Sequence, residues 1–228
     1  MCGRFIMVST IVTLANLFKV RIEDIIFDLK PNYNVAPGQD IVIVVNDQGK
    51  NRLILSRWGF IPSWAKDEST GYKMINARSE TIAEKRVFKT AFEKYRCLIV
   101  ADGFYEWKRE GKTKIPVFIR LKTGKPLGFA GLYNRWISPE GKEIITSTII
   151  TTRANEILEP IHDRMPVITT AEKQDLWLDP DVNDKSILLP LLNPYPSEEM
   201  EYYDVSPRVN SPRNNSSECI KPSNTPGG

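Results

Sequence analysis

The stretch that decides the fold runs from residue 41 to residue 58 and reads IVIVVNDQGKNRLILSRW. Its two ends, residues 41–45 and 53–58, are short apolar runs rich in the residue types that favour β-strands. Between them lies Asp47-Gln48-Gly49-Lys50, a combination typical of a tight hairpin turn. The stretch therefore predicts two neighbouring antiparallel strands.

Further apolar runs extend this pattern on the C-terminal side, at residues 98–101, 116–121, 127–132 and 144–151. Turn-like sequences at residues 109–112 and 139–142 predict two more hairpins. Because strands and helices do not alternate regularly, we predict an α+β fold with antiparallel pairing rather than a doubly wound parallel sheet.

Signals for helices are fewer than those for strands. Ser9 or Thr10 can cap a helix that reaches about Phe18. Apolar residues recur at helical spacing from position 87 to position 95, which predicts a second helix. Thr169, followed three residues later by Glu172, has the capping-box pattern of a third.

Length and composition indicate one globular domain over residues 1–221, followed by a tail over 222–228 that we expect to be disordered. The net charge is +3, from 31 basic and 28 acidic residues, which is too small to indicate nucleic-acid binding by itself. There is no signal-peptide pattern and no run near the roughly 18 apolar residues of a membrane span. We therefore expect a cytoplasmic protein with no membrane partner.

The cysteines and the histidine are too few for several kinds of site. Three cysteines, at positions 2, 97 and 219, do not form a disulfide framework. Cys97 lies in an apolar run, which predicts a buried thiol without a chemical role. With one histidine and isolated cysteines, a metal site built on them is implausible, and we expect no metal and no cofactor.

Cys2 is the most distinctive candidate for chemistry. Removal of Met1, which is usual before a small residue, would give Cys2 a free α-amine two carbons from its thiol. The amine can attack an aldehyde to form a Schiff base, and the thiol can then close a five-membered thiazolidine ring. An α-amine has a pKa of about 7.7–8.0, so part of it is nucleophilic at neutral pH. Alone, a cysteine at position 2 is equally compatible with no role.

Three other residue types suit proton transfer or orientation of a substrate. His162, the single histidine, lies beside Asp163 and Arg164, and imidazole exchanges protons near neutral pH. Glu106 stands between aromatic residues that can raise the pKa of its carboxyl group. Asn76 can orient a sugar or a carbonyl. Each of these residues also has an ordinary structural alternative, as a core, loop or strand residue.

Further residues are candidates for contact with a nucleic acid. Trp58 and Trp64 flank a Gly/Pro bend, and exposed rings there can stack on bases. Hydrophobic packing is the alternative for each ring. Polar or basic side chains that are candidates for contact with a nucleic acid occur elsewhere along the chain, at Asn34, Arg78, Arg208 and Arg213.

Eight short motifs follow one another along the chain, and their order is informative. They are Cys2-Gly3-Arg4-Phe5, Tyr33-Asn34-Val35-Ala36-Pro37, Trp58-Gly59-Phe60-Ile61-Pro62-Ser63-Trp64, Asn76-Ala77-Arg78-Ser79-Glu80, Ala101-Asp102-Gly103-Phe104-Tyr105-Glu106-Trp107, Phe129-Ala130-Gly131-Leu132, His162-Asp163-Arg164-Met165-Pro166 and Val209-Asn210-Ser211-Pro212. In this order the sequence closely resembles the SOS response-associated peptidase (SRAP) family, from Cys2 to about residue 221.

The resemblance implies both a fold and a function. The implied fold is a compact, barrel-like, mostly antiparallel β core with flanking helices and a basic groove for single-stranded DNA. Cys2 would be the nucleophile that forms a thiazolidine with an abasic site, and Asn76, Glu106 and His162 would complete the active site. Arg4, Arg78 and Arg164 resemble contacts to phosphate or to the site. We expect a DNA-associated monomer.

Two other functions remain open from the sequence. In one, Cys2 is the N-terminal nucleophile of a peptidase and its own amine serves as the base. In the other, the protein is a non-covalent binding module for single-stranded DNA in which Cys2 has no part.

Overall fold

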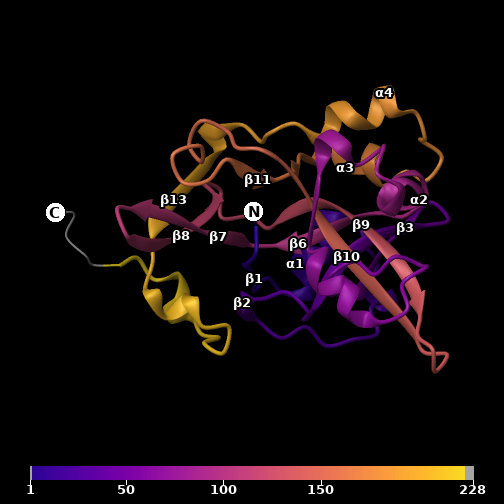
Figure 1. Cartoon of the computed structure of the whole chain (residues 1–228), viewed down its shortest axis with the longest axis horizontal. Coiled ribbons are helices and arrows are strands. Elements are labelled where there is room, and N and C mark those ends of the chain that lie inside the picture. Colours follow the sequence, from indigo (N-terminus) through magenta and orange to yellow (C-terminus); the bar gives the residue numbers. More distant parts are fainter. Residues whose placement is uncertain (1, 224–228) are drawn as a thin grey trace.

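The computed structural model describes residues 2–223, which contain a closed five-stranded β-barrel (Figure 1). The barrel strands are β3 (Asp40–Asp47), β4 (Lys50–Trp58), β6 (Arg96–Ala101), β9 (Leu127–Ile137) and β10 (Glu143–Arg153). They follow the order β10-β4-β3-β6-β9, and β9 pairs again with β10 to close the ring. The β10–β4 pairing is parallel and the other four are antiparallel.

Three short strands extend the barrel. They are β5 (Asn76–Arg78), which runs parallel to β10, β11 (Arg164–Pro166), which pairs antiparallel with β10, and β12 (Ile168–Thr169), which pairs with β9. Two predicted site motifs, those of Asn76 and Arg164, are thus attached to the same barrel strand although they lie far apart in sequence.

A second, fully antiparallel sheet lies beside the barrel. In order it contains β13 (Met200–Asp204), β8 (Thr113–Leu121), β7 (Gly103–Glu110), β1 (Phe5–Met7) and β2 (Asn32–Val35). In Figure 1, β13, β8 and β7 are on the left and the barrel strands β3, β9 and β10 on the right, with the N-terminus between them.

Aromatic side chains join the two sheets and so fix the start of the chain. The ring of Phe5 on β1 lies 5.0 Å from that of Trp58 and 6.0 Å from that of Phe129, both on barrel strands. Phe104 on β7 also packs on Phe129, with 5.8 Å between the ring centroids. Because Cys2 lies three residues before β1 and Glu106 lies on β7, this packing holds both residues near the junction of the sheets.

Helices and 3₁₀ turns cover the outside and make up the connections. The α-helices are α1 (Ile11–Phe18), α2 (Arg86–Lys94), α3 (Ala171–Leu178) and α4 (Lys185–Leu188). The 3₁₀ turns are η1 (Ile22–Asp24), η2 (Glu68–Lys73), η3 (Ser79–Thr81), η4 (Leu189–Leu192), η5 (Ser197–Glu199), η6 (Pro207–Asn210) and η7 (Ser217–Ile220). No helix within residues 2–223 is long and apolar enough to cross a membrane.

The predicted α+β class, the antiparallel barrel-like core and all six predicted strands are confirmed. The first hairpin turns through Gln48 and Gly49, whose φ angles of 52° and 80° suit a two-residue turn of the type that matches strand twist. Thr10 caps α1, because its hydroxyl accepts the Thr13 N–H at 3.2 Å.

The predicted cap of the third helix is wrong by one residue. Thr170 is the N-cap of α3, whereas Thr169 belongs to β12 and its hydroxyl donates to the Gly128 carbonyl at 3.1 Å. The Thr169 hydroxyl is therefore bonded to the neighbouring strand and does not cap the helix.

The C-terminal segment returns to the second sheet. Pro222 forms an antiparallel bridge with Val205, and the Ser223 N–H donates to the Asp204 carbonyl at 2.8 Å. Residues 222 and 223 of the predicted tail are thus held against the end of β13. The rest of that tail, residues 224–228, lies outside the described residues, as does Met1.

Candidate active site

Cys2 lies three residues before the start of β1 and is fully buried. The amide nitrogen of Asn76 donates to the Cys2 carbonyl oxygen at 2.9 Å, and the register of β5 against β10 sets the position of Asn76. The Asn76 amide oxygen is also buried and has no hydrogen-bond partner within residues 2–223. It is an acceptor held beside Cys2 with unused capacity.

Burial raises the pKa of the Cys2 thiol, and the nearby charge of Glu106 raises it further. The thiol is therefore protonated at rest, and a reaction at sulfur needs a base. The Cys2 thiol donates a hydrogen bond to the Arg4 carbonyl oxygen, with 3.9 Å between sulfur and oxygen.

Glu106 is suited to act as that base. It lies on β7 opposite Val117 of β8 and is 5% exposed. Burial raises the pKa of its carboxyl group to about 7, and the negative charge of Asp163 adds to the effect. A carboxyl group with this pKa can both accept and return a proton at neutral pH.

His162 is held in one tautomer by the turn that contains it. Its Nδ1 accepts the backbone N–H of Arg164 at 2.9 Å, so in the neutral ring the proton resides on Nε2. Burial lowers the pKa of His162 and so favours this neutral form. The Asp163 carboxylate, 2.8 Å from Nδ1, has the opposite effect and stabilises the protonated ring.

Glu106 and His162 line one cavity of about 430 Å³. Its other lining residues are Trp107, Arg109, Lys114 and Asn210. Cys2 is not one of these lining residues, but it is close enough to Glu106 for the charge of Glu106 to raise the pKa of its thiol. The four predicted catalytic residues, which come from four separate motifs, are thus connected through Cys2 and this cavity.

The sequence did not identify Arg109 and Lys114 as site residues. Both are exposed and lie directly opposite each other on the β7–β8 hairpin. The signal in the sequence was the hairpin turn predicted at residues 109–112. Strands that flank a tight turn pair residue by residue, so a turn there places Arg109 near Lys114.

Arg4 and Asn34 fasten the C-terminal segment beside the site. Arg4 donates to the Asn34 side-chain oxygen at 2.7 Å and to the Val209 carbonyl at 2.8 Å. The Asn34 amide nitrogen donates to the carbonyls of Val209, Ser211 and Asn214 at 3.2, 2.9 and 2.8 Å. Asn34 is only 1% exposed, and its side chain makes its hydrogen bonds within the protein. The expectation that Asn34 contacts DNA is therefore corrected.

Trp107 links the same segment to the cavity. Its indole N–H donates to the Asn210 side-chain oxygen at 2.7 Å, and the Arg4 guanidinium lies 5.9 Å from the centre of its ring. One wall of the cavity therefore depends on the contact between β7 and the C-terminal segment.

The two predicted stacking residues differ sharply in exposure. Trp58 is fully buried and donates its indole N–H to the Ile75 carbonyl at 3.0 Å, so its predicted contact with a base is corrected to a role in the core. Trp64 is 65% exposed and keeps a free ring surface.

The remaining predicted arginines fall into two groups. Arg164 is held by Glu80 through two hydrogen bonds of 2.6 and 3.0 Å and also donates to Thr151. Arg78, Arg208 and Arg213 are exposed to solvent. Only the second group is available to a ligand without rearrangement.

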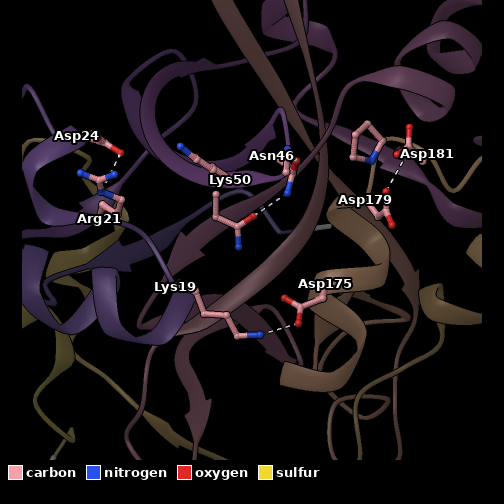
Figure 2. A pocket seen from close by; sticks show the side chains of 11 residues that line it. Lys19, Arg21, Asp24, Asn46, Lys50, Asp175, Asp179 and Asp181 are labelled. Atoms are coloured by element: carbon pink, nitrogen blue, oxygen red, sulfur yellow. Dashed lines mark hydrogen bonds and ion pairs between the residues drawn. The ribbon is translucent and has the colours of Figure 1, made fainter.

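A second hollow, of about 660 Å³, lies between the β3–β4 turn and the ends of α1 and α3 (Figure 2). Its charged side chains largely pair with each other: Lys19 with Asp175 at 2.6 Å and Arg21 with Asp24 at 3.9 Å. It contains no residue predicted to carry chemistry. Within residues 2–223 no group of three or more His, Cys, Asp or Glu side chains is arranged to hold a metal ion.

Comparison with known proteins gives a consistent result. A family model described as SOS response associated peptidase (SRAP) matches residues 1–212. Abasic site processing protein YoqW of Bacillus subtilis (strain 168) is 51% identical over 222 residues, which cover 97% of this chain and 99% of that protein. Abasic site processing protein HMCES of Xenopus tropicalis is 33% identical over 222 residues, covering 84% of this chain and 66% of that protein.

Solved structures give the same answer for the fold. A crystal structure of a protein from Bacteroides thetaiotaomicron superimposes with a TM-score of 0.85 at 29% identity and covers 97% of this chain and 100% of that one. A crystal structure of a phage-related protein from Bordetella bronchiseptica has a TM-score of 0.69 at 28% identity, covering 90% of this chain and 94% of that one.

Proposed function

Because the chain belongs to the SRAP family, we propose that it processes abasic sites in single-stranded DNA by forming a covalent bond to Cys2. One observation carries this proposal: Cys2 lies against the Asn76 amide and within electrostatic reach of Glu106, which shares a cavity with His162. An aminothiol, a base and a proton donor are the groups that ring formation with an aldehyde requires.

The first step is attack by nitrogen. In the ring-opened abasic sugar, C1′ is an aldehyde carbon, and the Cys2 α-amine adds to it. Loss of water from this adduct gives a Schiff base. Glu106 can accept a proton that nitrogen releases and return it to the departing oxygen, while the Nε2–H of neutral His162 can donate a hydrogen bond to that oxygen.

The second step closes the ring. The Cys2 sulfur adds to C1′, the carbon–nitrogen double bond becomes single, and the thiol proton moves to Glu106 and then to the ring nitrogen. The overall change is aldehyde plus aminothiol to thiazolidine plus one water. Because the product has no Schiff base, it cannot promote β-elimination, and the DNA strand stays intact.

This chemistry requires the loss of Met1. An α-amine that carries a methionyl group is an amide and cannot form a Schiff base. Cys2 is fully buried in this structure, so the residues around it must move before C1′ can reach its nitrogen and sulfur. In this proposal, the Asn76 side-chain oxygen, which has no partner within residues 2–223, accepts a hydrogen bond from the new amine.

The DNA strand is held by the exposed groups around the site. Arg78, Arg208 and Arg213 can contact phosphates, and Trp64 can stack on a base. Arg164 contributes indirectly, since its backbone N–H fixes the tautomer of His162 while Glu80 holds its side chain.

A denaturing gel tests this proposal. Purified protein lacking Met1 is incubated with single-stranded DNA that carries one abasic site, and we expect a heat-stable shifted band that Cys2→Ala abolishes. A retained N-terminal tag should block the band because it removes the free amine. Normal crosslinking by a protein whose tag is proven to be retained would overturn thiazolidine chemistry.

The same experiment separates the other two functions. Cleavage of added peptides without a DNA adduct would favour the peptidase that the family description suggests, with Cys2 as nucleophile. A shift seen only under native conditions would favour a non-covalent binding module.

A further inference from the structure

The cavity beside Cys2 carries a pair of positive charges that the reaction above does not use. Arg109 and Lys114 both line it, together with Glu106 and His162. They are directly opposite each other on β7 and β8, where facing side chains have their Cβ atoms roughly 4.5–5.5 Å apart.

This pairing is unfavourable for the fold alone. Like charges directly opposite each other destabilise a pair of strands. Within residues 2–223, neither Arg109 nor Lys114 forms an ion pair or a side-chain hydrogen bond. Nothing in the described chain compensates for the repulsion, which suggests that an external anion does.

Acidic side chains nearby are committed elsewhere. Lys108, on the opposite face of β7, binds Glu110 and Asp204, each at 3.0 Å. Lys108 is thus neutralised by two carboxylates, whereas Arg109 and Lys114 have no acidic partner within residues 2–223. Among the residues that line the cavity, Glu106 is the single carboxylic acid, against two cations.

We propose that Arg109 and Lys114 form a subsite for one phosphodiester, the linkage that directly adjoins the abasic sugar in the bound strand. This rests on the proposed function, because the abasic sugar must occupy the same cavity to react with Cys2. Two cations from facing strands can bracket a single phosphate, with the guanidinium fork on two oxygens and the ammonium group as a point charge.

The subsite would also set the position of the strand. A phosphate fixed at the hairpin places the neighbouring C1′ at a defined depth in the cavity. Arg78, exposed on β5 two residues from Asn76 and therefore on the same side of that strand, is available to a phosphate on the other flank.

Binding of a non-reactive strand tests the subsite independently of crosslinking. The probe is single-stranded DNA with a tetrahydrofuran residue in place of the abasic sugar, measured by fluorescence anisotropy. We expect the R109A/K114A double variant to bind about fivefold more weakly at low salt. The slope of log affinity against log salt should be smaller by about 0.7, the value for one lost phosphate contact on a single strand.

Neutral linkages locate the phosphate. A methylphosphonate directly 5′ or 3′ of the tetrahydrofuran residue removes one charge at a time. We expect the unmodified protein to bind one of these two probes about fivefold more weakly than it binds the fully charged strand. R109A/K114A should bind that same probe as well as it binds the fully charged strand, because the contact is already lost. Equal further losses for the double variant at both linkages would overturn the subsite.

A matched control exists in the second hollow. Lys50 is an exposed lysine on the β3–β4 hairpin, far from the residues proposed to react, and Lys50→Ala should leave affinity and salt slope unchanged (Figure 2). R109A/K114A should melt at the same temperature as the unmodified protein or higher, because it removes a like-charge pair. If the unmodified protein binds the probe but never crosslinks an authentic abasic site, the proposed function fails. The binding data would still show whether Arg109 and Lys114 bind a phosphate.

Discussion

Replacement of Glu106 by glutamine should make the protein more stable at alkaline pH and impair its chemistry. The glutamine keeps the shape of the side chain but cannot ionise. In the unmodified protein, the buried carboxyl group must lose its proton as the pH rises, and the charge is then confined at the junction of two sheets. Glu106→Gln removes that penalty.

The magnitude follows from the two pKa values. The ordinary value for this carboxyl group is 4.5, whereas burial raises the pKa in the folded protein to about 7. The folded state therefore binds the proton more tightly than the unfolded state does. The resulting stabilisation is complete below pH 4.5 and is lost as the pH rises through 7. Between these limits the loss amounts to about 3 kcal/mol.

Urea unfolding of both proteins at pH 4.5 and pH 8.5 measures the effect. We expect the difference in free energy of unfolding, variant minus unmodified protein, to increase by about 3 kcal/mol between the two pH values. Crosslinking by Glu106→Gln should be slower by about 10²-fold or more at pH 7, because general acid–base catalysis contributes that much.

Glu156→Gln, at an exposed position outside the proposed machinery, serves as the control for removal of one carboxyl group. If Glu106→Gln showed the same stability difference at both pH values, the carboxyl group would not be desolvated, and its assignment as the base for the Cys2 thiol would fail with it. A pH-dependent stability change with undiminished crosslinking would refute only the catalytic role.

Three further substitutions separate structural from binding roles. Trp64→Ala should weaken binding of single-stranded DNA, measured by anisotropy, by about 1–3 kcal/mol and leave the melting temperature unchanged. Trp58→Ala should destabilise the fold, measured by calorimetry, by about 3–5 kcal/mol. The reverse pattern would contradict the exposures of the two rings. Asn34→Ala should lower the free energy of unfolding in urea by about 3 kcal/mol and admit proteases to residues 206–214, because Arg4 and three carbonyls each lose one hydrogen bond. Unchanged resistance to proteolysis would show that the segment is held by other contacts.

The barrel strands were predictable because their signals are local. The apolar runs of β3 and β4 and the turn at Gln48 and Gly49 specify a hairpin without reference to the rest of the chain. The closure of the barrel was not predictable in this way. It depends on the parallel pairing of β10 with β4, in which Thr146 faces Arg57, and no local pattern connects residues so far apart.

The candidate site shows the same division. Motif order identified Cys2, Asn76, Glu106 and His162 as a group, but motifs do not report exposure. Trp58 and Trp64 lie in one motif, yet the first is 0% exposed and the second 65%. Which ring faces solvent depends on the packing of Trp58 against Phe5, a contact between strands that only the folded chain defines.

Two arrangements that destabilise the fold line the same cavity, and this is the strongest physical reason to propose that the reaction occurs there. Glu106 is buried at a cost in stability at neutral and alkaline pH, and Arg109 faces Lys114 without compensation in the described chain. Natural proteins retain such locally unfavourable arrangements where function requires them. A raised carboxyl pKa suits proton transfer from a buried thiol, and an unneutralised cation pair suits a strand of phosphates. Because one ligand, a DNA strand with an aldehyde at C1′, would use both features together, neither needs a separate explanation.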